Sequence, residues 1–554
     1  MSGKLIWIFH GVLPKISSFT SFHSIIYLLP IFILVYAIMP KKVKKYYLLI
    51  ASYVFYFLVN GGMLIYLLLS TFLMHYFAIW IERLKSQMKD ALADADAENK
   101  ADKEKKKAIK KKYVLMQRGV VTLAVLVHIG ALVVLKYTGF FVTNINRLIE
   151  ISGSNATLAI PKFLVPIGIS FFSLQALSYV LDVYRGITKA DDNLLRLALF
   201  LGFFPQIIEG PICRYNQTAE KLWNCQPINS ESFTFGLQRV LFGMIKKIVI
   251  ADRLNTLVGV IFAEYAAYDG GVIAIGAILY TVQLYMDFSG VMDVVLGISQ
   301  VIGVELPENF QRPFFSKSIS EFWKRWHITL GTWFRDYIFY PVTTSGDMKK
   351  LTSAARKKLG NHYGPLIAGS IALFSVWICN GLWHGADWNY IFFGMYHFVL
   401  ILLGNMIVPL VRVVNKKLKI NPENFFYRSM QILRTSILVV VGELFFRAEG
   451  LMNGFHMFGK IFTDFNFSTL NGDLLVKGGM DYLDFIIIGI TLLGVFVVSI
   501  LNEKNISVRE AQTRPQKGAL VLQWSVIFAL AMFLIIFGAY GVGYAEVDPM
   551  YAQF

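Results

Sequence analysis

The sequence predicts an all-α polytopic membrane protein, and three observations lead to that fold class. Hydrophobic residues make up 56% of the 554-residue chain and charged residues 16%, whereas soluble proteins carry about 45–50% and about 25%. Apolar runs long enough to cross a hydrocarbon core of about 30 Å recur along the chain. The basic residues behind the net charge of +17 gather between those runs, as the positive-inside rule predicts. They therefore indicate cytoplasmic loops and no nucleic-acid partner.

We expect roughly 11–13 membrane spans of this kind. They lie near residues 23–39, 46–60, 62–81, 119–138, 163–184, 194–208, 234–262, 271–304, 364–383, 388–411, 430–447, 483–501 and 518–543. Gly and Pro interrupt several of them, for example at Pro166, Pro205 and Pro211. Such breaks are tolerated where the backbone lines a cavity, so they predict a central cavity. The first span is expected to remain in the mature protein, because no signal-peptide cleavage pattern accompanies it.

The spans and the polar stretches between them divide the chain into six parts. N-terminal helices (1–81) precede a charged insertion (82–118), whose alternating Lys, Ala and Glu residues predict a solvated helix. Its lysine excess places it in the cytoplasm, and three spans before it put the N-terminus outside. A long core (119–447), a polar loop (448–482), C-terminal helices (483–543) and a tail (544–554) follow. Basic residues at 502–517 place that loop in the cytoplasm and the tail outside.

Two short blocks each place a histidine beside a tryptophan. Trp326-His327 lies in a charged, aromatic segment, and Trp383-His384 lies in an apolar one. A lone histidine on an apolar helix is more often structural than catalytic. Two such blocks in one part of the chain favour a functional site.

The apolar block gives a candidate general base. Asn380, His384 and Trp388 recur every four residues, which predicts one helical face. Histidine exchanges a proton near neutral pH, and a general base contributes roughly 10²–10⁴ in rate. Gly381 and Gly385 would leave room for a ligand beside His384. The alternative is a histidine hydrogen-bonded to a neighbouring helix.

The segment around His327 carries too many charges for a span. Tryptophan and tyrosine favour the membrane–water boundary, so we expect an interfacial or re-entrant helix at one mouth of the cavity. Its basic residues can hold an anionic donor such as a phosphate-bearing cofactor, or equally well lipid headgroups. The charges are Glu321, Lys324, Arg325, Arg335 and Asp336, and the aromatic residues are Trp323, Trp326, Phe334 and Tyr337.

Two acids, Asp287 and Asp293, fall inside a predicted span, where ionisable residues are functional candidates. They can orient a histidine, pair with Arg214 or Arg312, relay protons, or form a structural buried pair. The three cysteines show neither disulfide nor metal spacing. No phosphate-binding glycine loop, zinc signature or nucleophile elbow occurs in the sequence, so soluble-enzyme chemistries gain no support.

At this point the motifs resemble the membrane-bound O-acyltransferase superfamily. They are closest to its bacterial branch, typified by the alginate O-acetylation protein and the D-alanyl-teichoic acid transferase. The resemblance covers roughly residues 20–450. It is carried by residues 309–314 (NFQRPF), 316–327 (SKSISEFWKRWH), 333–337 (WFRDY), 381–385 (GLWHG), 170–179 (SFFSLQALSY) and 210–215 (GPICRY).

The resemblance implies a ring of helices around a funnel or tunnel, with 119–447 as the catalytic core. An acyl donor would enter from the cytoplasm and an acceptor hydroxyl from outside. His384 would be the main catalytic residue and His327 the second, which positions the donor or stabilises the thioester oxyanion. The residues expected to bind substrate are Trp383, Asn380, Trp326, Arg325, Lys324, Arg335 and Asp287.

The tail resembles a short motif, Phe-x-Tyr-x-x-Phe, whose tyrosine is thought to carry the acyl group in some relatives. Tyr551 and Phe554 match it, and Pro549 replaces its first Phe. A phenol with a pKa near 10 is only about one part in a thousand ionised at pH 7, so Tyr551 would need a base such as His384. It would then act as a covalent intermediate. A disordered tail that ends in aromatic residues is the alternative.

The sequence thus predicts a multi-pass enzyme of the cytoplasmic membrane that O-acylates hydroxyls of an extracytoplasmic polysaccharide, with acetyl as the first candidate group. The donor would be acetyl-CoA or an acyl-carrier protein thioester, with no tightly bound cofactor or metal. Membrane lipid and accessory envelope acyltransferase proteins are the expected partners. The alternatives are D-alanyl transfer from a carrier protein to teichoic acid, fatty acylation of a lipid or protein, and a non-catalytic transporter or flippase.

Overall fold

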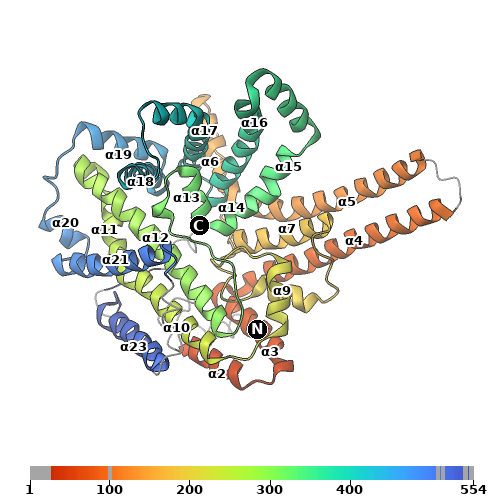
Figure 1. Cartoon of the computed structure of the whole chain (residues 1–554), viewed down its shortest axis with the longest axis horizontal. Helices are drawn as coiled ribbons and strands as arrows, with labels where there is room; N and C mark the ends of the chain where they lie inside the picture. The colour runs from red at the N-terminus through yellow and green to blue at the C-terminus, as the bar shows by residue number, and fades with distance from the viewer. Residues whose placement is uncertain are drawn as a thin grey trace. The chain divides into compact units, whose positions relative to one another are not determined.

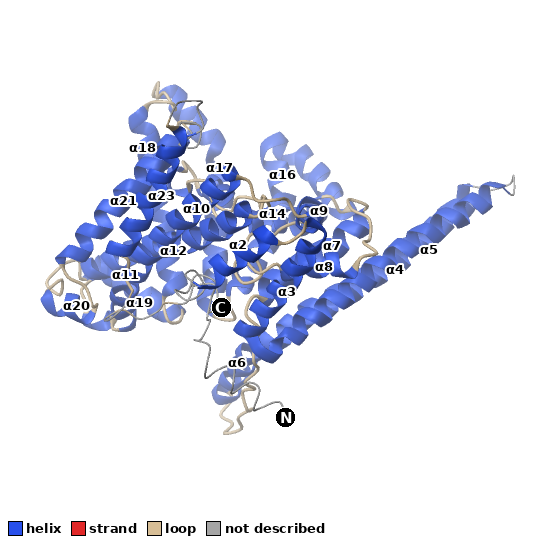
Figure 2. Cartoon of the chain, turned by 90° about the horizontal axis from the view of Figure 1, so that it is seen from below, coloured by secondary structure: helices blue, strands red, loops and turns tan. Residues whose placement is uncertain are grey.

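The computed structural model describes residues 27–97, 103–506, 512, 518–540, 544 and 547. Every regular element in those ranges is helical (Figure 2), and eight helical segments are long and apolar enough to cross a membrane. The all-α polytopic prediction is therefore confirmed. The chain forms two compact units, residues 1–229 with 302–306 and residues 230–301 with 307–554.

The first unit is built from eight helices among the described residues. They are α2 (Leu29–Ile38), α3 (Lys41–Asn60), α4 (Leu64–Ala97), α5 (Lys103–Leu132), α6 (Thr138–Ile151), α7 (Ile169–Arg185), α8 (Leu194–Gly202) and α9 (Tyr215–Asn224). The charged insertion is helical on both sides of residues 98–102. It continues α4 and begins α5, and the two helices run side by side (Figures 1 and 2).

Two predicted spans of this unit, 163–184 and 194–208, are shorter than a membrane crossing. Residues 155–166 are non-helical, and α7 starts only at Ile169 because Gly168 adopts a left-handed φ of 81°. A Cβ at Gly168 would lie 2.4 Å from the carbonyl oxygen of Ile207, so only glycine fits this contact. The 17-residue α7 and nine-residue α8 are largely buried within the protein.

The second unit holds the remaining helices. They are α10 (Ser230–Met244), the π-helical segment η4 (Ile245–Ala251), α11 (Asp252–Ala263), α12 (Gly270–Val301), α13 (Ile319–Arg325), α14 (Ile328–Phe334), the π-helical segment η7 (Arg335–Phe339), α15 (Tyr340–Thr343), α16 (Gly346–His384), α17 (Trp388–Lys417), α18 (Phe425–Arg447), α19 (Leu451–Thr463), α20 (Gly472–Lys477), α21 (Tyr482–Glu503) and α23 (Ala519–Phe537). The stretch 448–482, expected as a polar loop, thus contains α19 and α20.

Helices α10 and α12 pack backbone against backbone. A Cβ at Gly243 would lie 2.5 Å from the Gly290 carbonyl oxygen, and one at Gly236 would lie 2.8 Å from that of Gly297. On each helix the two glycines are seven residues apart, which is about two helical turns. Small residues on one stripe let two helices approach this closely. This contact fixes α12, which places the Phe288 ring against His327.

Candidate active site

His384 is the last residue of α16. The chain then extends through Gly385, and the Asp387 carboxylate accepts a hydrogen bond from the Trp388 amide at 2.6 Å to start α17. His384 is buried, whereas Trp388 is 49% exposed. The predicted common face of Asn380, His384 and Trp388 is therefore wrong for Trp388, because the helix ends between them. Asn380 lies one turn before His384 and is buried.

Aromatic rings surround the His384 imidazole. Its centroid lies 5.0 Å from that of Trp383, 5.1 Å from Phe446 on α18 and 6.1 Å from Phe393 on α17. The C-terminal end of a helix carries partial negative charge, which stabilises a cation by about 0.3–1 kcal/mol. His384 therefore lies at the negative end of the α16 dipole and is enclosed by these three aromatic rings.

The two glycines beside His384 serve helix packing. A Cβ at Gly381 would lie 2.5 Å from the Tyr390 carbonyl oxygen, and one at Gly385 would lie 2.3 Å from the Tyr390 ring. The room that the sequence suggested for a ligand is thus occupied by α17. These glycines hold α16 against α17 and so set the position of His384.

His327 lies between α13 and α14 with a left-handed φ of 44°. Such a conformation is uncommon for a residue with a Cβ and costs energy. The segment predicted as one interfacial helix is therefore broken at His327. The ring is buried, and burial lowers the pKa of His327 to about 3. Its Nδ1 lies 3.2 Å from Oδ1 of Asn309.

A single tryptophan joins the two histidines. The Trp383 ring centroid lies 5.0 Å from that of His384 and 5.6 Å from that of His327. Phe288 on α12 contacts the His327 ring at 4.9 Å. The structure therefore brings His327, Trp383 and His384 together, from segments more than fifty residues apart in the sequence.

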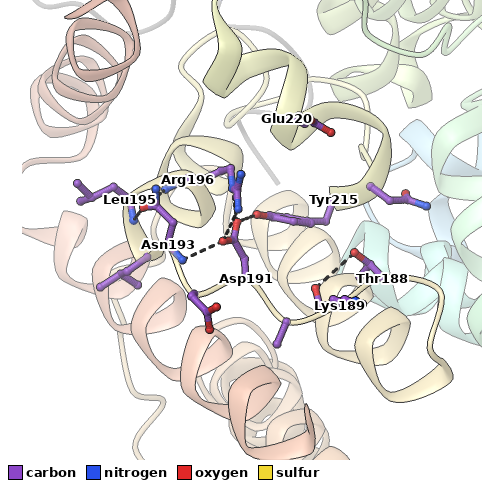
Figure 3. A pocket seen from close by; sticks show the side chains of 12 residues that line it. Thr188, Lys189, Asp191, Asn193, Leu195, Arg196, Tyr215 and Glu220 are labelled. Atoms are coloured by element: carbon purple, nitrogen blue, oxygen red, sulfur yellow. Dashed lines mark hydrogen bonds and ion pairs between the residues drawn. The ribbon is translucent and has the colours of Figure 1, made fainter. Parts of the chain in front are cut away.

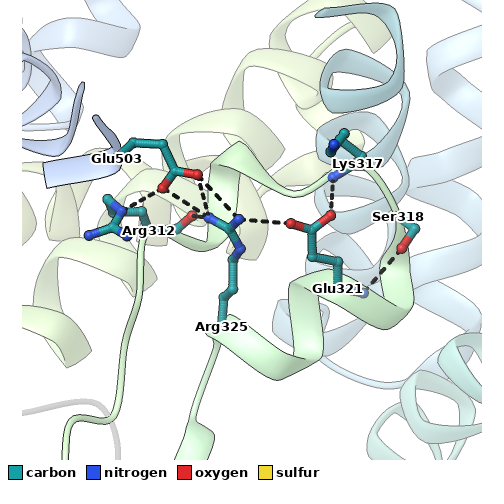
Figure 4. Close-up of polar contacts among 6 residues, drawn as sticks. All are labelled: Arg312, Lys317, Ser318, Glu321, Arg325 and Glu503. Carbon is teal, nitrogen blue, oxygen red and sulfur yellow. Dashed lines mark hydrogen bonds and ion pairs between the residues drawn. The ribbon is translucent and has the colours of Figure 1, made fainter. Parts of the chain in front are cut away.

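Arg325 belongs to an ion cluster, which Figure 4 shows. Its guanidinium lies 2.8 Å from Glu321 and 3.1 Å from Glu503, and Arg312 pairs with the same Glu503 at 2.6 Å. This arrangement neutralises Arg325, so its predicted role in holding an anionic donor gains no support. The cluster instead ties α13 to the end of α21.

The other predicted binding residues of this segment lie in three different environments. Lys324 is exposed to solvent. Arg335 is 53% exposed and pairs with Asp336 at 2.9 Å. Trp326 is buried against Phe310 at 5.1 Å and Phe322 at 5.4 Å between ring centroids. Trp326 is thus part of the aromatic packing beneath His327, which differs from the predicted substrate contact.

Asp287 forms a buried ion pair with Lys247 of η4 at 3.0 Å, and Lys247 also contacts Asp252 at 2.6 Å. Of the roles that the sequence left open for Asp287, the structure shows the buried ion pair, with Lys247 as its partner. Asp293 likewise pairs with Lys246 at 2.5 Å and with Arg239 at 3.0 Å. Sequence reasoning missed these cations because it treated 234–262 as a single span. The dipeptide Lys246-Lys247 inside an apolar run was the available signal.

Tyr551 lies outside the described residues. The nearest described position before it is Val547, whose carbonyl oxygen accepts a hydrogen bond from Lys247 Nζ at 3.1 Å. Arg253 contacts the Phe537 carbonyl oxygen at 2.6 Å. Lys247 of η4 thus contacts both Val547 and the buried Asp287, and Arg253 of α11 contacts the end of α23.

Two further features bear on ligand binding. Among the described residues, no group of three or more His, Cys, Asp or Glu side chains is placed to hold a metal ion. A pocket of about 760 Å³ in the first unit is lined by residues between Thr188 and Glu220 (Figure 3). There the Asp191 carboxylate accepts hydrogen bonds from Arg196 and Tyr215.

Comparisons with known proteins identify the family of this chain. The sequence model of the membrane-bound O-acyltransferase family (MBOAT) matches residues 163–356. The chain is 33% identical over 420 residues to the probable alginate O-acetylase AlgI of Pseudomonas putida, which covers 75% of this chain and 80% of that protein. It is 30% identical over 301 residues to the peptidoglycan O-acetyltransferase of Helicobacter pylori (50% and 53%) and 30% identical over 290 residues to the teichoic acid D-alanyltransferase of Bacillus subtilis (51% and 69%). The chain therefore belongs to the membrane-bound O-acyltransferase family and is an O-acyltransferase.

Proposed function

We propose that this enzyme moves an acetyl group from a cytoplasmic thioester, acetyl-CoA or an acyl-carrier protein, to hydroxyls of an extracytoplasmic polysaccharide. The relatives named for alginate and peptidoglycan O-acetylation support both the acetyl group and a glycan acceptor. Family membership favours catalysis over the transporter alternative. We place the enzyme in the cytoplasmic membrane, with accessory envelope proteins completing the transfer.

The buried position of His384 at the end of α16 carries the proposed mechanism. As a hydroxyl oxygen attacks the thioester carbonyl, its proton passes to the His384 imidazole. The carbon–sulfur bond breaks, and the imidazolium returns the proton to the leaving thiolate. The dry aromatic wall of Trp383, Phe393 and Phe446 strengthens each of these electrostatic interactions.

We propose Tyr551 as an acyl carrier between donor and polysaccharide. Val547 is held by Lys247, which also contacts Asp287. The residue after Asp287 is Phe288, whose ring contacts His327. We propose that the four residues after Val547, which span at most about 14 Å, carry the Tyr551 phenol toward the two histidines. The phenol would attack the thioester first, and a sugar hydroxyl would then attack the resulting aryl ester.

Mass spectrometry of the C-terminal peptide tests this route. Protein from its native host is incubated with donor and without acceptor, and its C-terminal peptide is analysed. An acyl adduct on Tyr551 that disappears when acceptor is added supports the two-step transfer. The adduct's mass separates acetyl from D-alanyl, which the Bacillus subtilis relative keeps as the second candidate. An unmodified Tyr551, with full activity in Tyr551→Phe, would leave direct transfer at His384.

A further inference from the structure

We infer that Asn389 is a positioning residue for His384. Its side-chain amide holds the end of α18, and the Phe446 ring at that end keeps the His384 imidazole in place. Asn389 is the second residue of α17 and is 4% exposed. The inference rests on the proposed role of His384 as the general base. It adds a residue to which the sequence motifs assigned no role.

Both hydrogens of the Asn389 amide are used at the end of α18. Nδ2 lies 3.1 Å from the carbonyl oxygen of Phe446 and 3.1 Å from that of Ala448. A carbonyl oxygen only accepts hydrogen bonds, so the atom that faces both of them is the NH₂ group. The last carbonyl groups of a helix have no partner within that helix. Asn389 therefore supplies donors that α18 itself lacks, and it ties the end of α18 to the start of α17.

The ring of the same Phe446 packs against His384. The two ring centroids are 5.1 Å apart and the ring planes are nearly perpendicular, at 88°. Tyr390, the residue after Asn389, contacts the Phe446 ring at 5.0 Å, and Phe393 contacts it at 5.0 Å. His384 and Asn389 flank the turn between α16 and α17, and both contact Phe446, one at its ring and one at its carbonyl oxygen. A shift at the end of α18 would therefore carry the Phe446 ring away from His384.

This arrangement matters because proton transfer depends on distance. A general base acts within about 2.6–3.2 Å of the atom whose proton it takes, and a misplacement of about 1 Å can cost about 10²-fold in rate. Asn389→Asp keeps the size of the side chain but replaces the donating NH₂ group with an accepting oxygen. We expect this variant to lower kcat by about 10–100-fold. The KM values for donor and acceptor should stay unchanged, because the inference gives Asn389 no contact with either substrate.

Tyr396→Phe is the matched control. The Tyr396 hydroxyl of α17 donates to the Leu438 carbonyl oxygen of α18 at 2.9 Å, so it makes the same kind of contact between the same two helices. Tyr396 lies seven residues after Asn389, and the substitution keeps its ring. Both variants should lower the thermal unfolding temperature, but only Asn389→Asp should lower kcat. Equal losses of kcat in the two variants would overturn the positioning role, and so would an unchanged kcat in Asn389→Asp.

A double-mutant cycle with Phe446→Leu tests the route through the ring. Phe446→Leu alone should lower kcat, which keeps the test decisive if Asn389→Asp fails to fold. In the Phe446→Leu background, Asn389→Asp should cost less than about twofold more. Losses that multiply independently would overturn the inference. Retained activity in His384→Ala would count instead against the proposed function, and the same cycle measured by thermal unfolding would still decide whether Asn389 and Phe446 are coupled.

Discussion

The two histidine segments are built in opposite ways. His384 ends α16, which is kinked at Gly360, and aromatic rings and glycine-mediated contacts with α17 position it. His327 sits at a left-handed break between two seven-residue helices, where a hydrogen bond to Asn309 Oδ1 holds its ring. Apolar ring contacts exclude water from His384 but do not decide which of its nitrogens carries the hydrogen. The hydrogen bond to Asn309 makes that choice for His327. We therefore propose proton transfer at His384, and at His327 a ring held in one orientation.

Removing each imidazole gives the largest expected effects. His384→Ala should lower acyl transfer by roughly 10²–10⁴-fold, because it removes the general base. His327→Ala should cost less, about tenfold to a hundredfold, because it removes one hydrogen bond and its packing. Transfer assays on purified protein compare the two. His456 is exposed, so His456→Ala is the matched control. Equal losses of activity in His384→Ala and His327→Ala would contradict different roles for the two histidines.

Glycine packing predicts the next effect. Gly381→Ala places a Cβ 2.5 Å from the Tyr390 carbonyl oxygen, so α16 and α17 must separate at a cost of about 1–3 kcal/mol. His384 moves with them, and activity should fall together with thermal stability. Gly369→Ala on the same helix meets nothing within 4 Å, so it should be neutral or slightly stabilising. If Gly381→Ala and Gly369→Ala changed activity and stability equally, the contact between α16 and α17 would not be what positions His384.

The buried His327 makes stability depend on pH. Its folded pKa of about 3 lies below the ordinary value of 6.5, so below pH 6.5 the unfolded chain binds a proton that the folded chain does not. Stability is complete above pH 6.5 and falls as the pH drops toward 3, by about 2 kcal/mol at pH 5. Thermal unfolding at pH 7.5 and 5 measures it. His327→Gln should reduce this loss and His456→Gln should keep it.

The ion cluster gives the smallest effect. The Arg325–Glu503 pair is 21% and 33% exposed, so a double-mutant cycle should yield a coupling of about 0.5–1 kcal/mol that weakens with salt. The donor KM should change little in Arg325→Gln, because Glu321 and Glu503 already neutralise this guanidinium. A large rise in the donor KM would restore the anion-binding role that the sequence suggested.

The sequence predicts the fold class well because apolar composition and charge placement report directly on the membrane. It also points to His327 and His384, since both motifs stand out locally. It fails where tertiary contacts decide. The partner of Asp287 is Lys247, forty residues away. Asn309 and Thr329 become neighbours only through a turn whose strain no periodicity reveals. Gly381 is indistinguishable in sequence from a glycine that makes room for a ligand.

The α4–α5 hairpin has a practical consequence for imaging this enzyme. Its charged part, residues 82–97 and 103–118, continues both helices beyond their apolar halves. Sixteen residues of helix are about 24 Å long, so the hairpin would stand clear of a detergent micelle. Most multi-pass proteins without a soluble domain offer no such landmark, and their particle orientations are hard to assign. Within the first unit, the two charged halves would mark the direction of the two apolar spans that they continue.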